Sequence, residues 1–156
     1  MSASFLASLP AFDAFAGLAA AALLCYAPHC LKIYAIVRKT GRYSLRNPRE
    51  TVAKSVAEIG AEKPEARLIA RLQSCHEHHL EVFPIIATSV LMAVAAGVDR
   101  RSTDAATTLI VLLRGVHFAA YAAGASSVRA GAFLLTGVPV AFLMSSAAGL
   151  RMKASA

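Results

Sequence analysis

The sequence has few charged residues for its length. Asp, Glu, Lys and Arg make up 16% of its 156 residues, compared with about 25% in soluble domains. Hydrophobic residues reach 57%, and the mean hydropathy is +0.57. Because the apolar residues also occur in long runs, this composition indicates a protein of the lipid bilayer rather than a soluble domain.

Cysteine is scarce as well, which argues against a disulfide framework. Cys25 and Cys30 lie five residues apart in the first apolar run, and Cys75 lies elsewhere. The stretch CYAPHC lacks the CxxCH pattern of a c-type haem attachment site. No Lys or Arg precedes the first apolar run, so we do not expect a signal peptide there; Ser8 and Pro10 instead predict a helix start.

Four segments are long and almost uncharged: residues 14–31, 82–98, 105–125 and 130–150. A helix needs about 20 mostly apolar residues to cross a bilayer. Short linkers near residues 99–104 and 126–129 make consecutive helices antiparallel neighbours. The sequence therefore predicts an all-α integral membrane protein, a four-helix bundle with antiparallel up-and-down topology.

We expect a single membrane domain over residues 1–156. Its predicted spans are residues 10–38, 64–98 (80–98 within the membrane), 103–123 and 128–150, with a loop at residues 39–63. Within this loop, Asn47 and Pro48 predict a turn that opens a short helix over residues 49–60. Ser126 and Ser127 are candidate caps of the last span.

The positive charge is concentrated in one region. Nine of the 16 Lys and Arg residues, and four Glu residues, lie between Arg38 and Arg71. Basic residues favour the cytoplasmic side, so we expect a multi-pass protein of a bacterial inner (plasma) membrane, with the basic loop cytoplasmic and both termini outside. The loop is short, partly acidic and without a stacking platform, so lipid headgroups rather than nucleic acid are its expected partner.

The stretch SCHEHHLEVFP, residues 74–84, collects polar side chains at the start of a span. On a helix, Arg71, Ser74, His78 and Glu81 share one face, whereas His76 and His79 point elsewhere and are expected at the surface. The next span has a stripe of Arg114, His117 and Tyr121 at positions i, i+3 and i+7.

Arg114 lies within an otherwise uncharged run, where a charge costs about 2.5–3.5 kcal/mol on insertion scales. We therefore expect Arg114 to face the bundle interior and to pair with Glu81 or Glu77. Topology brings Glu81, Tyr121 and Arg129 to the cytoplasmic end of three helices. A structural ion pair, an interfacial tyrosine and a snorkelling arginine are the simpler alternatives.

The sequence does not predict a metal site. An HExxH motif needs histidines at i and i+4, but Leu80 follows His76 at that distance. Five histidines are too few for a membrane di-iron enzyme of the histidine-box type. A pair formed by His78 and Glu81 alone would lack further ligands.

Three stretches together resemble the family of membrane-associated proteins in eicosanoid and glutathione metabolism, known as MAPEG. RNPRE (46–50) is similar to the family's Asn-Pro segment, and RLQSCHEHHLEVFP (71–84) to its span-two signature. RGVHFAAYAAGASSVRA (114–130) resembles its Arg-x-x-His-x-x-x-Tyr pattern and the Arg that follows. The chain departs from the family at three positions. His78 stands where the family usually has Asn, and Ala130 where it often has Ser. Phe133 stands where some members have an aromatic residue with a hydroxyl group.

The resemblance implies a homotrimer of four-helix subunits that binds glutathione as a co-substrate between neighbouring subunits, near the cytosolic side. It also implies a lipophilic second substrate that enters from the bilayer, and glutathione-dependent transferase or peroxidase activity. By carry-over, Arg129 would stabilise the glutathione thiolate. The other implied site residues are His78, Glu81, Arg114, His117, Tyr121, Lys39 and Arg38.

Two further interpretations remain open. Some members of the family present a lipid to a partner without catalysing a reaction, and the departures at His78 and Ala130 favour this alternative. A purely structural bundle, whose polar groups set the helix register, is the third.

Overall fold

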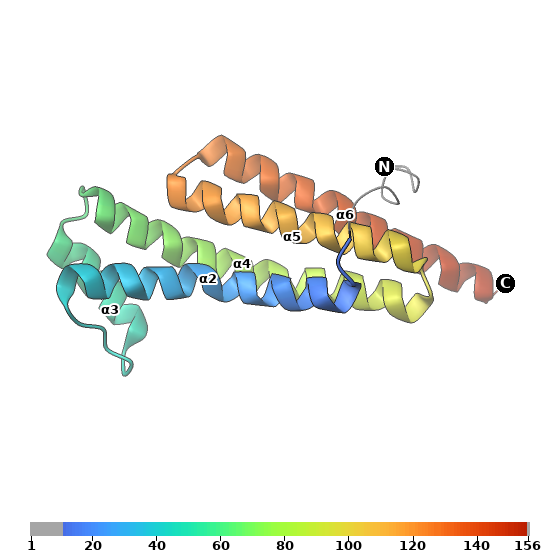
Figure 1. Cartoon of the computed structure of the whole chain (residues 1–156), viewed down its shortest axis with the longest axis horizontal. Helices are drawn as coiled ribbons and strands as arrows, with labels where there is room; N and C mark the ends of the chain where they lie inside the picture. The colour runs from blue at the N-terminus through green and yellow to red at the C-terminus, as the bar shows by residue number, and fades with distance from the viewer. Residues whose placement is uncertain (1–10, 156) are drawn as a thin grey trace.

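The structure, a computed structural model, describes residues 11–155 and is all-helical over that range. Its elements are α2 (Ala14–Thr40), α3 (Pro48–Ile59), α4 (Pro64–Ala96), α5 (Arg100–Ala123) and α6 (Ser126–Ala154). The four long helices are each apolar enough to cross a membrane, and they run antiparallel in sequence order (Figure 1). The predicted fold class, an antiparallel membrane bundle, is confirmed.

Side-chain caps and glycines fix the helix ends. The Asp13 carboxylate accepts hydrogen bonds from the first backbone N–H groups of α2, so the helix starts at Ala14; the predicted start at Ser8 and Pro10 lies outside the described residues. Asp99 caps α5 by accepting from the Ser102 N–H at 2.9 Å, and this bond lowers the pKa of the Asp99 carboxyl.

Two local predictions have different outcomes. Pro48 opens α3 as expected, with Asn47 before it. The predicted capping of the last helix by Ser126 and Ser127 is wrong, because α6 starts after Ala125 and has no side-chain cap. Gly124 ends α5 in the left-handed conformation, with φ 76°, so the turn into α6 depends on a glycine rather than on a serine hydroxyl.

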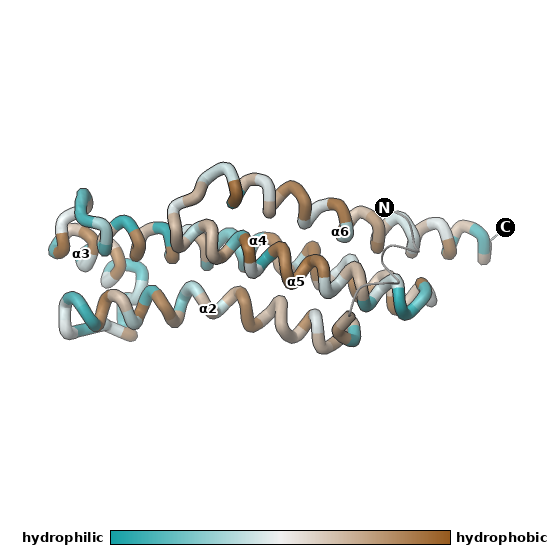
Figure 2. The backbone as a smooth tube through the Cα atoms, turned by 45° about the horizontal axis from the view of Figure 1, so that its top comes forward, coloured by the Kyte–Doolittle hydropathy of each residue, from teal (hydrophilic) through white to brown (hydrophobic). Residues whose placement is uncertain are grey.

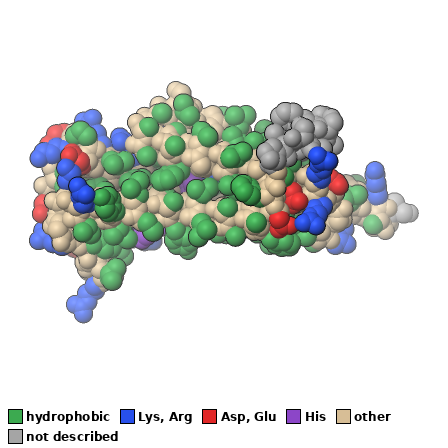
Figure 3. Space-filling view, viewed as in Figure 1, with side chains coloured by type: hydrophobic (Ala, Val, Ile, Leu, Met, Phe, Trp, Pro, Cys, Tyr) green, Lys and Arg blue, Asp and Glu red, His purple; other side chains and the backbone are tan. Residues whose placement is uncertain are grey.

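The four long helices pack as two pairs, α2 with α4 and α5 with α6, which lie against each other (Figure 1). Small and β-branched residues fill the seam, including Ala93, Ala106 and Ile110. Hydrophobic residues dominate the middle of the bundle and hydrophilic ones its two ends (Figure 2). On the face shown in Figure 3, Lys, Arg, Asp and Glu side chains likewise gather at the ends.

Gly17 marks the closest approach of α2 to α5. A Cβ atom at this position would lie 2.6 Å from Cγ2 of Thr107, which is fully buried and β-branched. Small residues at such crossings let membrane helices approach closely. The contact leaves no room for a side chain at position 17 unless Thr107 shifts.

Gly17→Ala is therefore expected to lower the free energy of unfolding by about 1–3 kcal/mol through overpacking. Gly149→Ala is the matched control, because a Cβ there meets nothing within 4 Å and alanine favours helix by up to about 1 kcal/mol. Thermal unfolding in detergent measures both. A Gly17 variant as stable as the Gly149 variant would show that the α2–α5 contact is not tight.

Candidate functional site

Side chains from three helices meet in one polar cluster near the loop end of the bundle. The rings of His78 in α4 and His117 in α5 stack with centroids 4.9 Å apart. His117 also makes an edge contact with Tyr121, at 5.0 Å. The guanidinium of Arg129, in the first turn of α6, lies 4.6 Å from the centroid of the Tyr121 ring. The structure thus brings together four of the residues singled out in the sequence.

Arg114 lies in the interior, as its position in an apolar run predicts. It is 2% exposed, and its two terminal nitrogens, Nη1 and Nη2, have no hydrogen-bond partner among the described residues. The predicted pairing with Glu81 or Glu77 is wrong: Glu81 is exposed, and Glu77 accepts a hydrogen bond from Gln73 at 2.5 Å. Over residues 11–155, neither carboxylate forms an ion pair with the buried guanidinium.

Arg129 also has no neutralising partner in the part of the chain that the structure describes. Over residues 11–155, the carboxylates that form ion pairs bind other cations, and Arg129 instead lies over the face of Tyr121. A cation over an aromatic ring is held by the ring quadrupole without losing its charge. The cluster therefore presents net positive charge, from Arg114 inside and from half-buried Arg129 at its edge.

The prediction that His76 and His79 lie at the surface is wrong. His79 is 2% exposed, and its Nε2 lies 3.2 Å from Nδ1 of His117. His76 is half-buried, and its Nδ1 lies 2.7 Å from the backbone oxygen of Cys25. The α4 surface that carries His76 and His79 was predicted to face outward. It is instead covered by α2 and α5, because α4 packs against both helices.

Arg38 and Lys39, the remaining candidates, have partners away from this cluster. Arg38 donates to the Tyr34 hydroxyl at 3.0 Å, one turn back on α2. Lys39 forms an exposed ion pair with Glu65 at 2.5 Å. Within one subunit, neither side chain is part of the histidine–tyrosine–arginine cluster.

Two contacts that hold neighbouring helices together were not predicted from the sequence. Arg71 donates a hydrogen bond to the carbonyl of Ala122, 3.1 Å away at the end of α5. This bond joins α4 to the end of α5, from which the chain turns into α6 and Arg129. Lys32 is 3% exposed. Its Nζ donates a hydrogen bond to Oε1 of Gln73 and lies 3.2 Å from Nδ1 of His29. A lysine within an apolar helix is the only signal in the sequence that pointed to the second contact.

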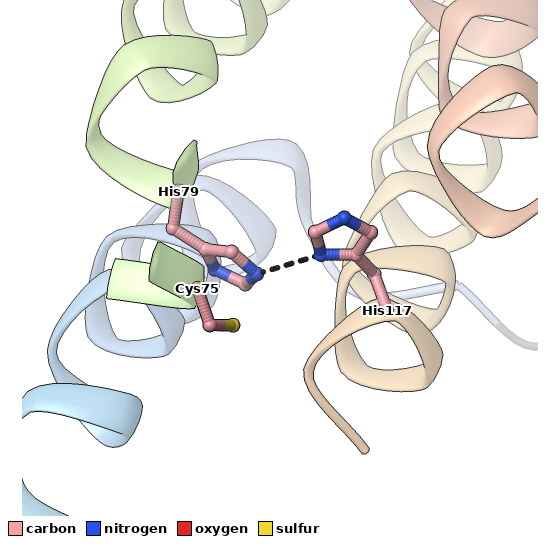
Figure 4. Close-up of side chains that lie close together, drawn as sticks. All are labelled: Cys75, His79 and His117. Atoms are coloured by element: carbon pink, nitrogen blue, oxygen red, sulfur yellow. Dashed lines mark hydrogen bonds between the residues drawn. The ribbon is translucent and has the colours of Figure 1, made fainter. Parts of the chain in front are cut away.

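A third group lies deeper in the bundle. The side chains of Cys75, His79 and His117 are all buried, and their ligand atoms lie within 4.8 Å of one another. Figure 4 shows Cys75 and His79 extending from α4 toward His117 on α5, with the two imidazoles joined by a hydrogen bond. The sequence did not suggest this group, because His117 is 38 residues from His79.

Comparison of the chain with models of protein families identifies the same family that its sequence motifs resemble. A family model, described as the MAPEG family, matches residues 14–149, nearly the whole chain. No curated protein and no solved structure is similar enough to the chain to count as a match.

Proposed function

Because the chain belongs to the MAPEG family, we propose that it binds glutathione and directs the glutathione thiolate at a lipophilic electrophile. The family includes glutathione transferases and related proteins. The observation that carries the proposal is a pair of guanidiniums beside His117 and Tyr121. Arg114 and Arg129 have no carboxylate partner among residues 11–155. A buried cation without a counterion is costly in a bundle interior, and an anionic ligand would supply one.

Glutathione fits this charge pattern. Its two carboxylates and its amine leave it anionic at neutral pH, and its thiol becomes a nucleophile on losing a proton. Arg129 stabilises the thiolate, while Arg114 binds a carboxylate or the same sulfur from the interior side. Tyr121, which lies under the Arg129 guanidinium, and His78, which stacks on His117, are the neighbouring groups that contact the bound ligand in this proposal.

The chemistry requires no further group. In conjugation, the thiolate sulfur forms a bond to an electrophilic carbon, the leaving group departs with its electron pair, and the thiol proton goes to solvent. In peroxide reduction, the thiolate attacks the distal oxygen, the alkoxide leaves and takes a proton, and a second glutathione converts the sulfenic acid to the disulfide and water. Both reactions suit a substrate that reaches the cluster from the bilayer.

We further propose that a homotrimer completes the site. Glu81 is exposed on the subunit surface, and Arg38 and Lys39 lie near the loop end of α2, where a neighbouring subunit can receive them. This arrangement gives the three residues a role in binding the peptide part of glutathione that one subunit alone does not provide.

Calorimetry of glutathione binding to the purified protein in detergent, together with ultraviolet difference spectroscopy of the thiolate, tests the proposal. Binding with thiolate formation is the expected result. Binding without thiolate would support the alternative, a lipid-presenting protein, which the replacement of the family's Ser by Ala130 favours. Absence of binding would leave only a structural role for the two arginines.

The basic loop is proposed to lie in the cytoplasm and both termini outside. In a Cys30→Ser background, a thiol introduced by Ser44→Cys in the exposed loop should be protected from a membrane-impermeant reagent in intact cells. A thiol introduced by Ala154→Cys should react, since both positions are exposed on the subunit. The reverse labelling pattern would overturn this orientation.

A further inference from the structure

The buried group formed by Cys75, His79 and His117 lies inside the bundle, and the proposed reaction gives no role to Cys75 or His79; His117 is shared with the polar cluster. These side chains are 0%, 2% and 1% exposed. Cys75 and His79 are four residues apart on α4, so they project from one helix face, and His117 faces them from α5 (Figure 4). One thiol and two imidazoles are a ligand set for soft or borderline transition metals.

The spacing of the ligand atoms suits a single ion. Three ligands at metal–sulfur and metal–nitrogen distances of about 2.0–2.3 Å, the lengths found at zinc, lie about 3.5–4.0 Å apart around a trigonal ion. Nε2 of His79 and Nδ1 of His117 are already 3.2 Å apart. All three ligand atoms lie within 4.8 Å of one another, about 1 Å beyond the spacing around a bound ion, so only a small movement of the ligands is needed.

Charge decides which ion fits. Arg114, also buried, has no counterion among the described residues, so an added net charge in this interior would be unfavourable. A divalent ion on one thiolate and two neutral imidazoles adds a net charge of +1. A monovalent ion on the same ligands adds none, because it replaces the proton of the thiol.

We propose that Cys75, His79 and His117 form an internal binding site for one Cu(I) ion per chain. On binding, the Cys75 thiol loses its proton to solvent and the sulfur bonds to the ion. The hydrogen bond between the two histidines breaks, and its proton moves to the other nitrogen of the same ring, which leaves both facing nitrogens as ligands. Copper stays Cu(I) throughout, so the step needs no oxidant or reductant.

The test is an anaerobic titration of the full-length protein in detergent with Cu(I), in the absence of glutathione and in competition with a Cu(I) chelator. One ion should bind per chain. Cys75→Ser should lower the affinity by more than about 100-fold, beyond the 10- to 100-fold typical of changes outside the ligand shell. Cys30→Ser, which removes an exposed cysteine on α2, is the matched control and should leave the affinity unchanged.

X-ray absorption spectroscopy of the wild-type protein keeps the proposal testable even where a variant fails to fold. One sulfur and two nitrogen ligands are expected at copper. A shell of sulfur alone, equal losses for Cys75→Ser and Cys30→Ser, or tighter binding of Zn(II) than of Cu(I) would each overturn it. Glutathione binding is measured separately, so failure of this site leaves the proposed reaction untouched.

Discussion

Arg129→Leu is expected to lower glutathione-dependent turnover by at least about 100-fold, the effect of removing one group that stabilises a developing or bound anion. Arg129 lies in the first turn of α6, where the helix N-terminus adds partial positive charge. An arginine also keeps its charge throughout the physiological pH range. A cation and a helix N-terminus together lower the pKa of a nearby thiol, and in the proposed site leucine removes the larger contribution.

The pH profile separates this role from a purely structural one. In the variant, the bound thiol should ionise at higher pH, so activity and thiolate absorbance should recover partly in alkaline solution. Tyr121→Phe should cost less, because it removes only one hydrogen-bonding group. Arg151→Leu, an exposed change at the other end of α6, is the control. Full activity of the Arg129 variant, or its unfolding, would refute the catalytic role.

Arg114→Met is expected to have two large effects of opposite sign. Without ligand, it should raise the free energy of unfolding by about 1–4 kcal/mol, as replacement of buried charges by apolar residues of similar volume often does. The reason is that the Arg114 guanidinium is 2% exposed and its terminal nitrogens are unpaired. Glutathione binding should be lost, because the buried charge that receives the anion is gone.

Thermal unfolding in detergent, with and without glutathione, measures both effects of Arg114→Met. The wild type should gain stability from the ligand and the variant should not. Arg101→Met, at an exposed position, serves as the control for loss of charge alone. A variant less stable than the ligand-free wild type would show that Arg114 already has a stabilising partner within the bundle.

Because Glu81 does not pair with Arg114, the expected order of the stability effects of Glu81→Gln and His78→Ala is reversed. If that pair existed, Glu81→Gln would be more damaging to folding than His78→Ala. Because Glu81 is exposed while the His78 ring packs against His117 and Phe133, we expect His78→Ala to destabilise the subunit more. Equal thermal stability of the two variants in detergent would contradict this packing.

The sequence by itself determined the membrane bundle. Apolar runs of about 20 residues are long enough to cross a bilayer, and in lipid a single segment satisfies its own backbone groups only as a helix. It also determined that Arg114 and His117 face inward, since they share one helix face and a charge there is too costly to meet lipid.

Only the tertiary structure decided which polar groups meet. Helical periodicity orders residues on one helix, but the rotation of α4 against its neighbours is set by core packing, in which Ile86, Val90 and Ala93 of α4 meet Ala106 and Ile110 of α5. That rotation turned His79 inward toward His117 and left Glu81 outside. A contact between residues 38 positions apart depends on three-dimensional packing that no local pattern encodes, so the Cys75–His79–His117 group became visible only in the folded chain.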